Sequence, residues 1–377
     1  MKQSFAQLGR YDAPIANTEC PTSRSSSSLF RAGEERPRPL RVVSYNVLAQ
    51  SLLNQTPQLY SNCSANALDA GLRRQRLVHL ISNLDADIVA LQEVEDFDNG
   101  LAAALASIGL SGAFKKRTGT PTDGVAIFFR SSRLALLNKE EVEYRRLADS
   151  VPAHMADKAR KDNVALVLHL RDEAAGHELL ACCTHILWNP KRGLVKLWQI
   201  DCLLRHVAQA RDRTGAAVLL MGDFNCVPHS LLYRFLCGQN VCTPEATEGT
   251  WDGMYGSQRS YSPQRPKGGS HGLVELAAPP LTKLLRSAYA QIGEPPCTTS
   301  HRGFTGTVDY VWFEASRFKL AGMLPVLSAQ KIQSLRGLPT SDQPSDHIPI
   351  GCELIWTCEQ MADGQAPDAG SLRGQPS

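Results

Sequence analysis

The feature that most constrains this chain is a repeated pattern in which an apolar strand ends in acidic or amide side chains. The segment VLLMGDFN, residues 218–225, runs from apolar residues directly into Asp223, Phe224 and Asn225. Side chains i and i+2 of an extended segment share one face, so Asp223 and Asn225 are predicted to point the same way, with Phe224 turned into the packing. Polar groups at strand ends are what a site built on the edge of a sheet requires.

Strand and helix signals alternate through the middle of the chain. Apolar runs of strand length lie at residues 40–47, 88–91, 125–129, 164–170, 179–184, 218–221, 307–313 and 348–354. Apolar residues at i, i+3, i+4 and i+7 spacing predict helices over 72–84 and 191–210, and Ser230 is predicted to cap a short helix. This alternation predicts one α/β domain over residues 39–357.

The ends of the chain have a different composition. Residues 1–38 and 358–377 are polar and rich in Ser, Gly or Pro, and both segments are predicted to be disordered tails. The segment Asp252–Gly272 has a similar composition and is predicted to be a long exposed loop. The N-terminal segment contains Arg and Ser but also several acidic residues, which leaves a mitochondrial location open without favouring it.

Composition also limits the kind of partner. The formal net charge is only +3, so a site for a polyanion must be a local patch rather than a property of the whole surface. The 11 cysteines form no C-x-x-C pair, which predicts free thiols in a reducing compartment, cytoplasmic or nuclear, and disfavours a zinc site. No apolar run reaches the length of a membrane span, and no membrane partner is expected.

Several other predicted strands carry polar residues of the same kinds at or near their ends. These residues are Asn46, Glu93, His185, Asp309 and His347. Each residue alone is typical of an ordinary turn, but the whole set suits the cleavage of a phosphoester. A carboxylate such as Glu93 can hold a hard divalent cation, which neutralises the phosphate, and Asp223 can orient and deprotonate the attacking water.

The amides and imidazoles supply the remaining parts of such a site. Asn46 and Asn225 can donate hydrogen bonds to phosphate or water without adding negative charge. His185 and His347 can donate to the non-bridging phosphate oxygens. Asp309 can fix the tautomer of His347 and keep it protonated.

Six ordered segments of the chain resemble the motifs of a known superfamily. The segments are SYNVLAQ, LQEVEDFD, THILWNP, GDFNCVP, VDYVWF and SDHIPI. They resemble the endonuclease/exonuclease/phosphatase superfamily, and within it the carbon catabolite repressor-type deadenylases with their Angel and nocturnin relatives. The resemblance implies a four-layered α/β sandwich, in which two packed mixed β-sheets are flanked by helices. It also implies 3′-to-5′ cleavage of RNA poly(A), dependent on Mg²⁺ or Mn²⁺, that releases 5′-AMP.

The resemblance assigns roles to the residues of these motifs. It implies that Glu93 is the metal ligand and Asn46 its neighbour, that Asp223 and Asn225 activate water and position phosphate, that Asp309 and His347 form a dyad, and that His185 binds phosphate. In GFTGTVDY it implies that Phe304 stacks on a base. In WNPKRG it implies that Pro190 borders the base pocket beside Asn189, and Lys191 and Arg192 are expected to contact phosphate.

Two features leave the reaction and the partners open. The segment before the predicted domain contains no leucine-rich repeat pattern, so docking to a large deadenylation complex is not expected. The segments THILWNPKRG and LSAQKIQSLRGLP lean towards the Angel branch, in which some members resemble RNA 2′,3′-cyclic phosphatases. The expected partner in either case is a single-stranded RNA 3′ end. A catalytically silent RNA-binding or scaffold protein is the third alternative.

Overall fold

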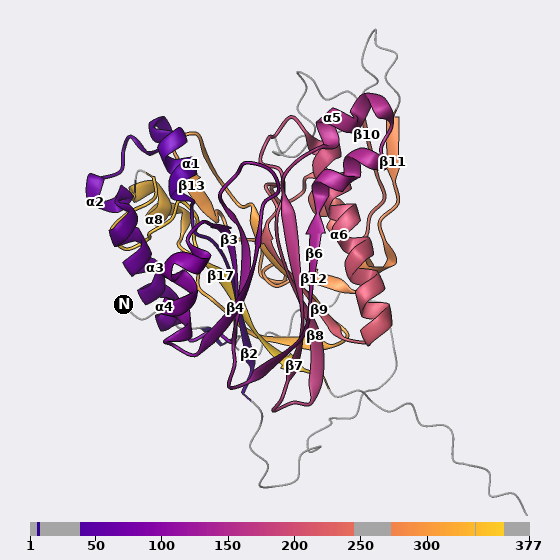
Figure 1. Ribbon diagram of the computed structural model, residues 1–377, viewed down its shortest axis with the longest axis horizontal. Helices are drawn as coiled ribbons and strands as arrows, with labels where there is room; N and C mark the ends of the chain where they lie inside the picture. Colours follow the sequence, from indigo (N-terminus) through magenta and orange to yellow (C-terminus); the bar gives the residue numbers. More distant parts are fainter. Residues whose placement is uncertain (1–5, 8–37, 245–272, 336, 358–377) are drawn as a thin grey trace, which may run out of the picture.

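Two β-sheets packed face to face form the centre of the molecule (Figure 1). The computed structural model describes residues 6–7, 38–244, 273–335 and 337–357. The predicted loop Asp252–Gly272 and the predicted C-terminal tail lie outside these residues. Within the predicted N-terminal tail the structure describes residues 6–7 and 38. Here Ala6 and Gln7 form a short strand paired with Met323 and Gly322.

The first sheet, called sheet I, contains most of the N-terminal strands and the last two strands of the chain. Its order is β1-β16-β17-β2-β3-β5-β4, and β2 and β3 are parallel while its other neighbours are antiparallel. The strands are β1 (Ala6–Gln7), β16 (Phe318–Met323), β17 (Ile350–Trp356), β2 (Leu40–Asn46), β3 (Ile88–Val94), β5 (Gly124–Arg130) and β4 (Leu110–Lys116).

The second sheet, sheet II, has the order β12-β15-β9-β8-β7-β6, with β8 and β9 parallel and its other neighbours antiparallel. Its strands are β12 (Leu285–Ser287), β15 (Asp309–Glu314), β9 (Ala217–Asp223), β8 (His177–His185), β7 (Val164–Asp172) and β6 (Leu134–Glu143). Two separate two-stranded sheets are formed by β10 (Val241–Pro244) with β11 (Leu273–Leu276), and by the β13 (Thr299–His301) and β14 (Phe304–Gly306) hairpin.

Helices cover the outer faces of both sheets (Figure 1). The α-helices are α1 (Gln50–Gln55), α2 (Ala65–Leu68), α3 (Ala70–Leu84), α4 (Ala102–Ala106), α5 (Ala156–Ala159), α6 (Gly193–Thr214), α7 (Leu231–Leu236) and α8 (Ala329–Ser334). Helices α3 and α4 pack on sheet I, and α6 and α7 pack on sheet II. The short turns are η1 (Pro57–Tyr60), η2 (Phe97–Leu101), η3 (Tyr144–Asp149), η4 (Ala153–Met155) and η5 (Pro280–Lys283). The predicted four-layered sandwich is confirmed.

The central strands are mostly apolar, and both of their faces are largely buried. In β2, Leu40 and Val42 contribute to the core between the two sheets, whereas Val43 and Tyr45 pack with α3 on the outer face. This follows from the alternation of side chains in an extended strand. Ser230 accepts a hydrogen bond from the backbone N–H of Tyr233 and caps α7, as predicted.

A buried ion-pair network joins the two sheets at the end opposite the polar strand ends. Arg133 lies between sheet I and sheet II, 2.9 Å from the carboxylate of Asp87 and 2.9 Å from that of Asp172. Both carboxylates are fully buried. One guanidinium therefore connects the residue before β3 with the last residue of β7.

We expect Arg133→Met to lower the free energy of unfolding by about 3 kcal/mol, because it removes one partner from two buried carboxylates. Urea unfolding midpoints measure this change. The matched control is Arg205→Met, which removes an exposed pair with Asp201 and is expected to cost less than about 1 kcal/mol. Equal midpoints for the two variants would contradict a stabilising role for the network.

Candidate active site

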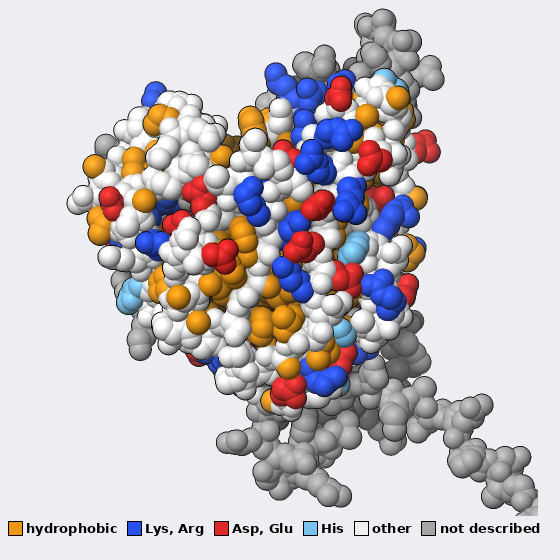
Figure 2. All heavy atoms as spheres, viewed as in Figure 1, with side chains coloured by type: hydrophobic (Ala, Val, Ile, Leu, Met, Phe, Trp, Pro, Cys, Tyr) orange, Lys and Arg blue, Asp and Glu red, His pale blue; other side chains and the backbone are white. Residues whose placement is uncertain are grey.

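A cleft of about 650 Å³ opens at the end of the two sheets where β2, β3, β8 and β9 terminate. Figure 2 shows the surface notched between two lobes at the end of the molecule where α1 and α5 lie. The predicted site residues Glu93, His185, Asp223, Asn225 and His347 all line this cleft. Asn46 and Asp309 are buried immediately behind them, so the structure brings all seven predicted catalytic and metal-site residues together.

Strand register places three of these residues side by side in sheet II. Asp223 ends β9 and lies directly opposite Asp309, which begins β15, and it also pairs with His185 at the end of β8. Gly222 precedes Asp223 with a φ of 152°, and a Cβ added there would lie 2.1 Å from the backbone oxygen of Thr184. Glycine at this position therefore permits the close approach of β8 and β9 that brings His185 to Asp223.

A bulge in sheet I turns Glu93 towards sheet II. The pairing of β3 with β5 shifts between Gln92 and Val94, and Glu93 has a φ of 59°. Such a conformation is unfavourable for a residue with a Cβ, and strained positions of this kind concentrate at functional sites. The Glu93 carboxylate accepts a hydrogen bond from the backbone N–H of Ala49 at 2.9 Å, which fixes its orientation.

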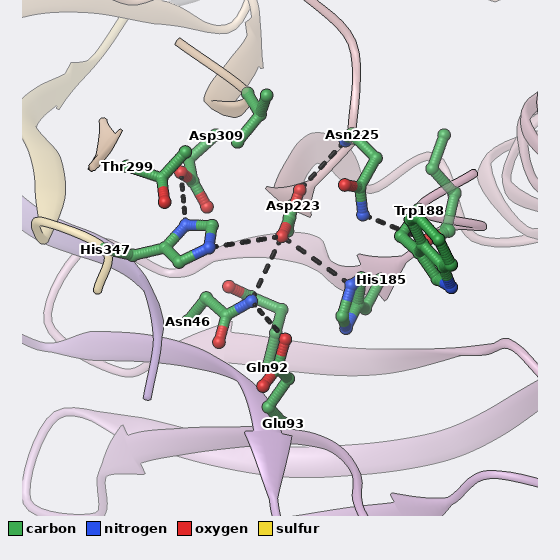
Figure 3. Close-up of polar contacts among 12 residues, drawn as sticks. Asn46, Gln92, Glu93, His185, Trp188, Asp223, Asn225, Thr299, Asp309 and His347 are labelled. Atoms are coloured by element: carbon green, nitrogen blue, oxygen red, sulfur yellow. Dashed lines mark hydrogen bonds and ion pairs between the residues drawn. The ribbon is translucent and has the colours of Figure 1, made fainter. Parts of the chain in front are cut away.

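Asn46 connects the two carboxylates across the interface between the sheets. Its side-chain NH₂ donates to Glu93 at 2.9 Å and to Asp223 at 3.0 Å (Figure 3). Its carbonyl oxygen accepts from the backbone N–H of Leu48 at 3.0 Å. A neutral amide therefore holds two acidic groups close together without cancelling their charge.

The acidic groups of the cleft hold their protons unusually tightly. Burial, followed by the charges of Asp346 and Asp123, raises the pKa of Glu93 to about 7. Burial, followed by the charge of Asp309, raises the pKa of Asp223 to about 7. These shifts arise because the charged forms are shielded from water and lie near other carboxylates.

The two histidines are in opposite electrostatic environments. His347 Nδ1 lies 2.8 Å from Asp309, and its Nε2 lies 3.8 Å from Asp223. Burial alone lowers the pKa of His347, but the charges of these carboxylates raise it well above its ordinary value. Burial and the nearby charges of Arg117 and His347 hold the pKa of His185 well below its ordinary value. His347 is therefore a cation at neutral pH, and His185 is a neutral imidazole 3.6 Å from Asp223.

Asn225 reaches the cleft by a turn rather than by the predicted extended strand. The strand β9 ends at Asp223, and Asn225 has a left-handed φ of 46°. The Asp223 carboxylate accepts a hydrogen bond from the Asn225 backbone N–H at 2.8 Å, and the Asn225 side chain donates to the backbone oxygen of Ile186 at 3.2 Å. Phe224 is fully buried, as predicted. Both polar side chains line the cleft, but the alternation argument for their direction is wrong because the chain turns after Asp223.

The donor set fits a hard divalent cation. Glu93 and Asp223 are oxygen donors whose pKa values are raised first by burial and then by neighbouring carboxylates, and a cation would favour their charged forms. The buried Oδ1 of Asp309 makes no hydrogen bond within the described residues. Ligand atoms of Asp223, Asp309 and His347 also lie within 4.8 Å of one another. However, a protonated His347 hydrogen-bonded to Asp309 cannot donate a lone pair, which favours the carboxylates as ligands.

The predicted substrate-binding residues divide into two groups. Phe304 and Pro190 line the cleft. Asn189, Lys191 and Arg192 do not line it: the Asn189 side chain accepts from the Lys191 backbone N–H at 2.9 Å, and Arg192 is the residue immediately before α6. The structure therefore brings the aromatic and proline residues to the cleft but leaves the two predicted phosphate-contacting cations outside its lining.

Several cleft residues were not predicted from the sequence. Arg117 follows β4, a strand with no clear apolar pattern, and its buried Nε has no hydrogen-bond partner among the described residues. Trp188 belongs to a motif that sequence reasoning used only for its neighbours, and Tyr60 comes from the turn η1. The Tyr60 hydroxyl donates to the Asp346 carboxylate at 3.0 Å.

Two buried cations support the loops behind the cleft. Arg73 of α3 donates to the backbone oxygens of Val47 and Pro344, both at 2.7 Å. Lys196 of α6 is fully buried and donates to the backbone oxygens of Asn225 at 2.8 Å and Trp188 at 3.3 Å. Each cation fixes segments that carry or adjoin site residues.

Comparison with known families agrees with this geometry. Residues 43–347 match the endonuclease/exonuclease/phosphatase family. The chain belongs to this family. Protein angel homolog 2 of Danio rerio is 31% identical over 383 residues, covering 87% of this chain and 66% of its own length. Carbon catabolite repressor protein 4 homolog 3 of Arabidopsis thaliana is 30% identical over 350 residues, covering 84% of this chain and 75% of its own length.

Solved structures show the same fold. The structure of ANGEL2, a 2′,3′-cyclic phosphatase, in complex with adenosine-2′,3′-vanadate is 29% identical, with a TM-score of 0.71 over 84% of this chain and 95% of that one. The human nocturnin catalytic domain is 21% identical with a TM-score of 0.59 over 85% and 95%, which supports the fold alone. The resemblance to the Angel, carbon catabolite repressor and nocturnin proteins is confirmed. Within the described residues, no helix is long and apolar enough to cross a membrane.

The raised pKa values predict how stability depends on pH. Glu93 and Asp223 have ordinary pKa values of 4.5 and 3.8, so the folded protein binds protons at these groups more tightly than the unfolded chain does. Their contribution therefore destabilises the folded state progressively as pH rises from the ordinary values through about 7. In EDTA we expect Glu93→Gln to reduce the loss of stability between about pH 5.5 and pH 7.5, as measured by urea unfolding.

A bound divalent cation should reduce this loss of stability at higher pH. Because protons compete with the cation for the carboxylates, added Mg²⁺ or Mn²⁺ is expected to raise the unfolding midpoint more at the higher pH. The control is Glu173→Gln, which removes an exposed carboxylate at the far end of β7. If Glu93→Gln and wild type show the same pH dependence, the proposed proton linkage is wrong.

Proposed function

We propose that the protein is a Mg²⁺-dependent 3′-to-5′ exoribonuclease that acts on single-stranded RNA 3′ ends, with poly(A) as substrate and 5′-AMP as product. The observation that carries this proposal is the placement of Glu93, Asn46 and Asp223 opposite the His347–Asp309 dyad. The wall of the same cleft holds an aromatic side chain, Phe304. This combination provides a cation site, a base and phosphate donors beside a surface for a nucleobase.

Asp223 is suited to accept the proton of the attacking water. Its pKa of about 7 matches the efficiency of a general base near neutral pH. The hydrogen bond from the Asn225 backbone holds the carboxylate in one orientation, and the Asn46 amide holds its other oxygen. Glu93 would hold Mg²⁺, and Asn46, whose side-chain NH₂ faces Glu93 and Asp223, would position these carboxylates. The bound cation would neutralise the phosphate and stabilise the charge that develops during hydrolysis.

The histidines are suited to donate hydrogen bonds to phosphate oxygens. Asp309 keeps His347 protonated, so its Nε2–H can donate a charge-assisted hydrogen bond to a non-bridging oxygen. His185, which is neutral, can supply a second donor without excess positive charge. Arg117 lines the same cleft and adds a cation on the side of His185.

A second candidate function keeps the site and changes the substrate. The chain carries the Angel-like segment WNPKRG and is similar to the ANGEL2 structure, whose ligand is adenosine-2′,3′-vanadate. These observations favour an RNA 2′,3′-cyclic phosphatase as the alternative. The complete set of acids, amides and histidines weighs against a catalytically silent scaffold.

One assay separates the candidates. Purified protein is incubated with Mg²⁺ and a 5′-labelled A-tailed RNA that ends in either a free hydroxyl or a 2′,3′-cyclic phosphate. We expect a ladder of RNAs shortened one nucleotide at a time, with a rate about 10²- to 10⁴-fold lower for Asp223→Asn because the general base is lost. The control Asp149→Asn changes an exposed aspartate outside the cleft lining and should retain the wild-type rate.

The products of this assay have distinct meanings. Loss of the cyclic phosphate without shortening would identify the cyclic phosphatase and exclude the exonuclease. If neither RNA changes and wild type behaves like Asp223→Asn, both hydrolytic proposals fail.

A further inference from the structure

We propose that Trp188 is a stacking platform for a second nucleobase, on the opposite side of the scissile phosphate from the base that contacts Phe304. The inference rests on the proposed RNA substrate and defines it further. It requires at least two unpaired nucleotides, one on each side of the phosphate. Trp188 would then contribute to the choice of substrate rather than to the chemical step.

The exposure of Trp188 is unusual for its residue type. Its relative exposure is 64%, whereas Trp312 in the core of sheet II is 1% exposed. Large hydrophobic side chains are exposed in the described part of the chain at Leu136, Leu137, Trp188, Ile292 and Ile355. Of these, only Trp188 lines the cleft. An exposed indole at the edge of a polar cleft offers a flat apolar surface that a nucleobase can cover.

Side chains of α6 hold the backbone around Trp188 by hydrogen bonds. The buried amine of Lys196 donates to the Trp188 backbone oxygen, and the Gln199 side chain accepts from the Leu187 backbone N–H at 2.9 Å. On the other side, the Asn189 side chain accepts from the Lys191 N–H. Burying a lysine is costly unless its hydrogen bonds are made, and the Lys196 amine makes such a bond to this segment. A platform held in place loses little conformational freedom when a base binds.

The two aromatic surfaces lie on different walls of the cleft. Phe304 belongs to the β13–β14 hairpin, which contacts η1 on the sheet I side through a hydrogen bond from the Arg302 N–H to the Leu59 backbone oxygen. Trp188 follows β8 of sheet II and lies beside Asn225 in Figure 3. In Figure 3, Asp223 lies between Trp188 on one side and Thr299 on the other, and Thr299 belongs to β13, which pairs with the Phe304 strand β14. An RNA strand whose phosphate occupies the site can therefore present one base to each wall.

A chemical double-mutant cycle tests this arrangement. The substrates are the A-tailed RNA and two versions that lack a single base, at the last or the second-to-last nucleotide. Stacking contributes roughly 1–3 kcal/mol per base, so we expect Trp188→Ala to raise KM about 10-fold while kcat changes less than about threefold. Trp188→Phe should retain most of the affinity. Removal of one of the two bases should raise KM for wild type by a similar factor, with no further increase in Trp188→Ala.

Phe304→Ala provides the complementary measurement. Its effect on KM should disappear with the other abasic RNA, the one for which Trp188→Ala still raises KM. Ile292→Ala is the control for loss of an exposed apolar side chain outside the cleft, and urea midpoints verify that all variants fold. The proposal is overturned if both abasic penalties are the same in Trp188→Ala and wild type. If wild type does not shorten RNA, the proposed exonuclease activity fails separately, and fluorescence anisotropy with the same RNAs and variants still decides whether Trp188 binds a base.

Discussion

The concentration of negative charge between the ends of the two sheets is the constraint on which the site depends. The register of β9 and β15 places Asp223 directly opposite Asp309, and the bulge in β3 directs Glu93 towards the same point. Like charges opposite each other on neighbouring strands destabilise a sheet. The charge is tolerated because His347 is held as a cation between Asp309 and Asp223. In addition, the raised pKa values of Glu93 and Asp223 leave both carboxyl groups partly protonated near neutral pH. The same excess of negative charge favours the binding of a divalent cation.

Two further cations are buried near the cleft, and both donate hydrogen bonds to backbone oxygens. Arg73 binds carbonyl oxygens in the loops that follow β2 and precede β17, and Lys196 binds carbonyl oxygens in the loops that follow β8 and β9. Each sheet is therefore covered by one helix whose buried cation binds the backbone of the loops next to the site. Because these cations form no ion pair with Glu93 or Asp223 in the described structure, they order the site and leave the carboxylates available for a ligand.

The strand-end pattern predicted the residues of the site but not their exact conformations. Apolar runs identified the buried strands because both of their faces are buried. In contrast, β6, with Asn138, Lys139 and three glutamates, was missed because it is a largely exposed edge strand. The left-handed conformation of Glu93 has no signature in its residue type, whereas Asn225 is of a type that adopts this conformation readily. The final two predicted strands begin two residues later than expected, at Asp309 and Ile350.

The buried cations were missed for a reason that sequence reading can correct. Arg73 lies on the buried stripe of α3 with Leu77 and Ile81, and Lys196 lies on the buried stripe of α6 with Ile200 and Leu203. Periodicity alone treats a charged residue in a helix as solvated. A cation in register with an apolar stripe, within the first turn of a helix that follows a site loop, instead predicts a side chain that binds backbone oxygens behind that site.

Surface charge and cleft shape together limit how RNA can be held. The net charge is only +3, and Figure 2 shows lysines and arginines interspersed with acidic residues over the visible face. Affinity for the proposed substrate therefore cannot come mainly from neutralising many phosphates, and its salt dependence should be shallow. Stacking on cleft walls and coordination at one phosphate remain as the main sources of affinity. Because a base inside a duplex cannot leave its stack without cost, this mode of binding selects unpaired 3′ ends without reading a sequence.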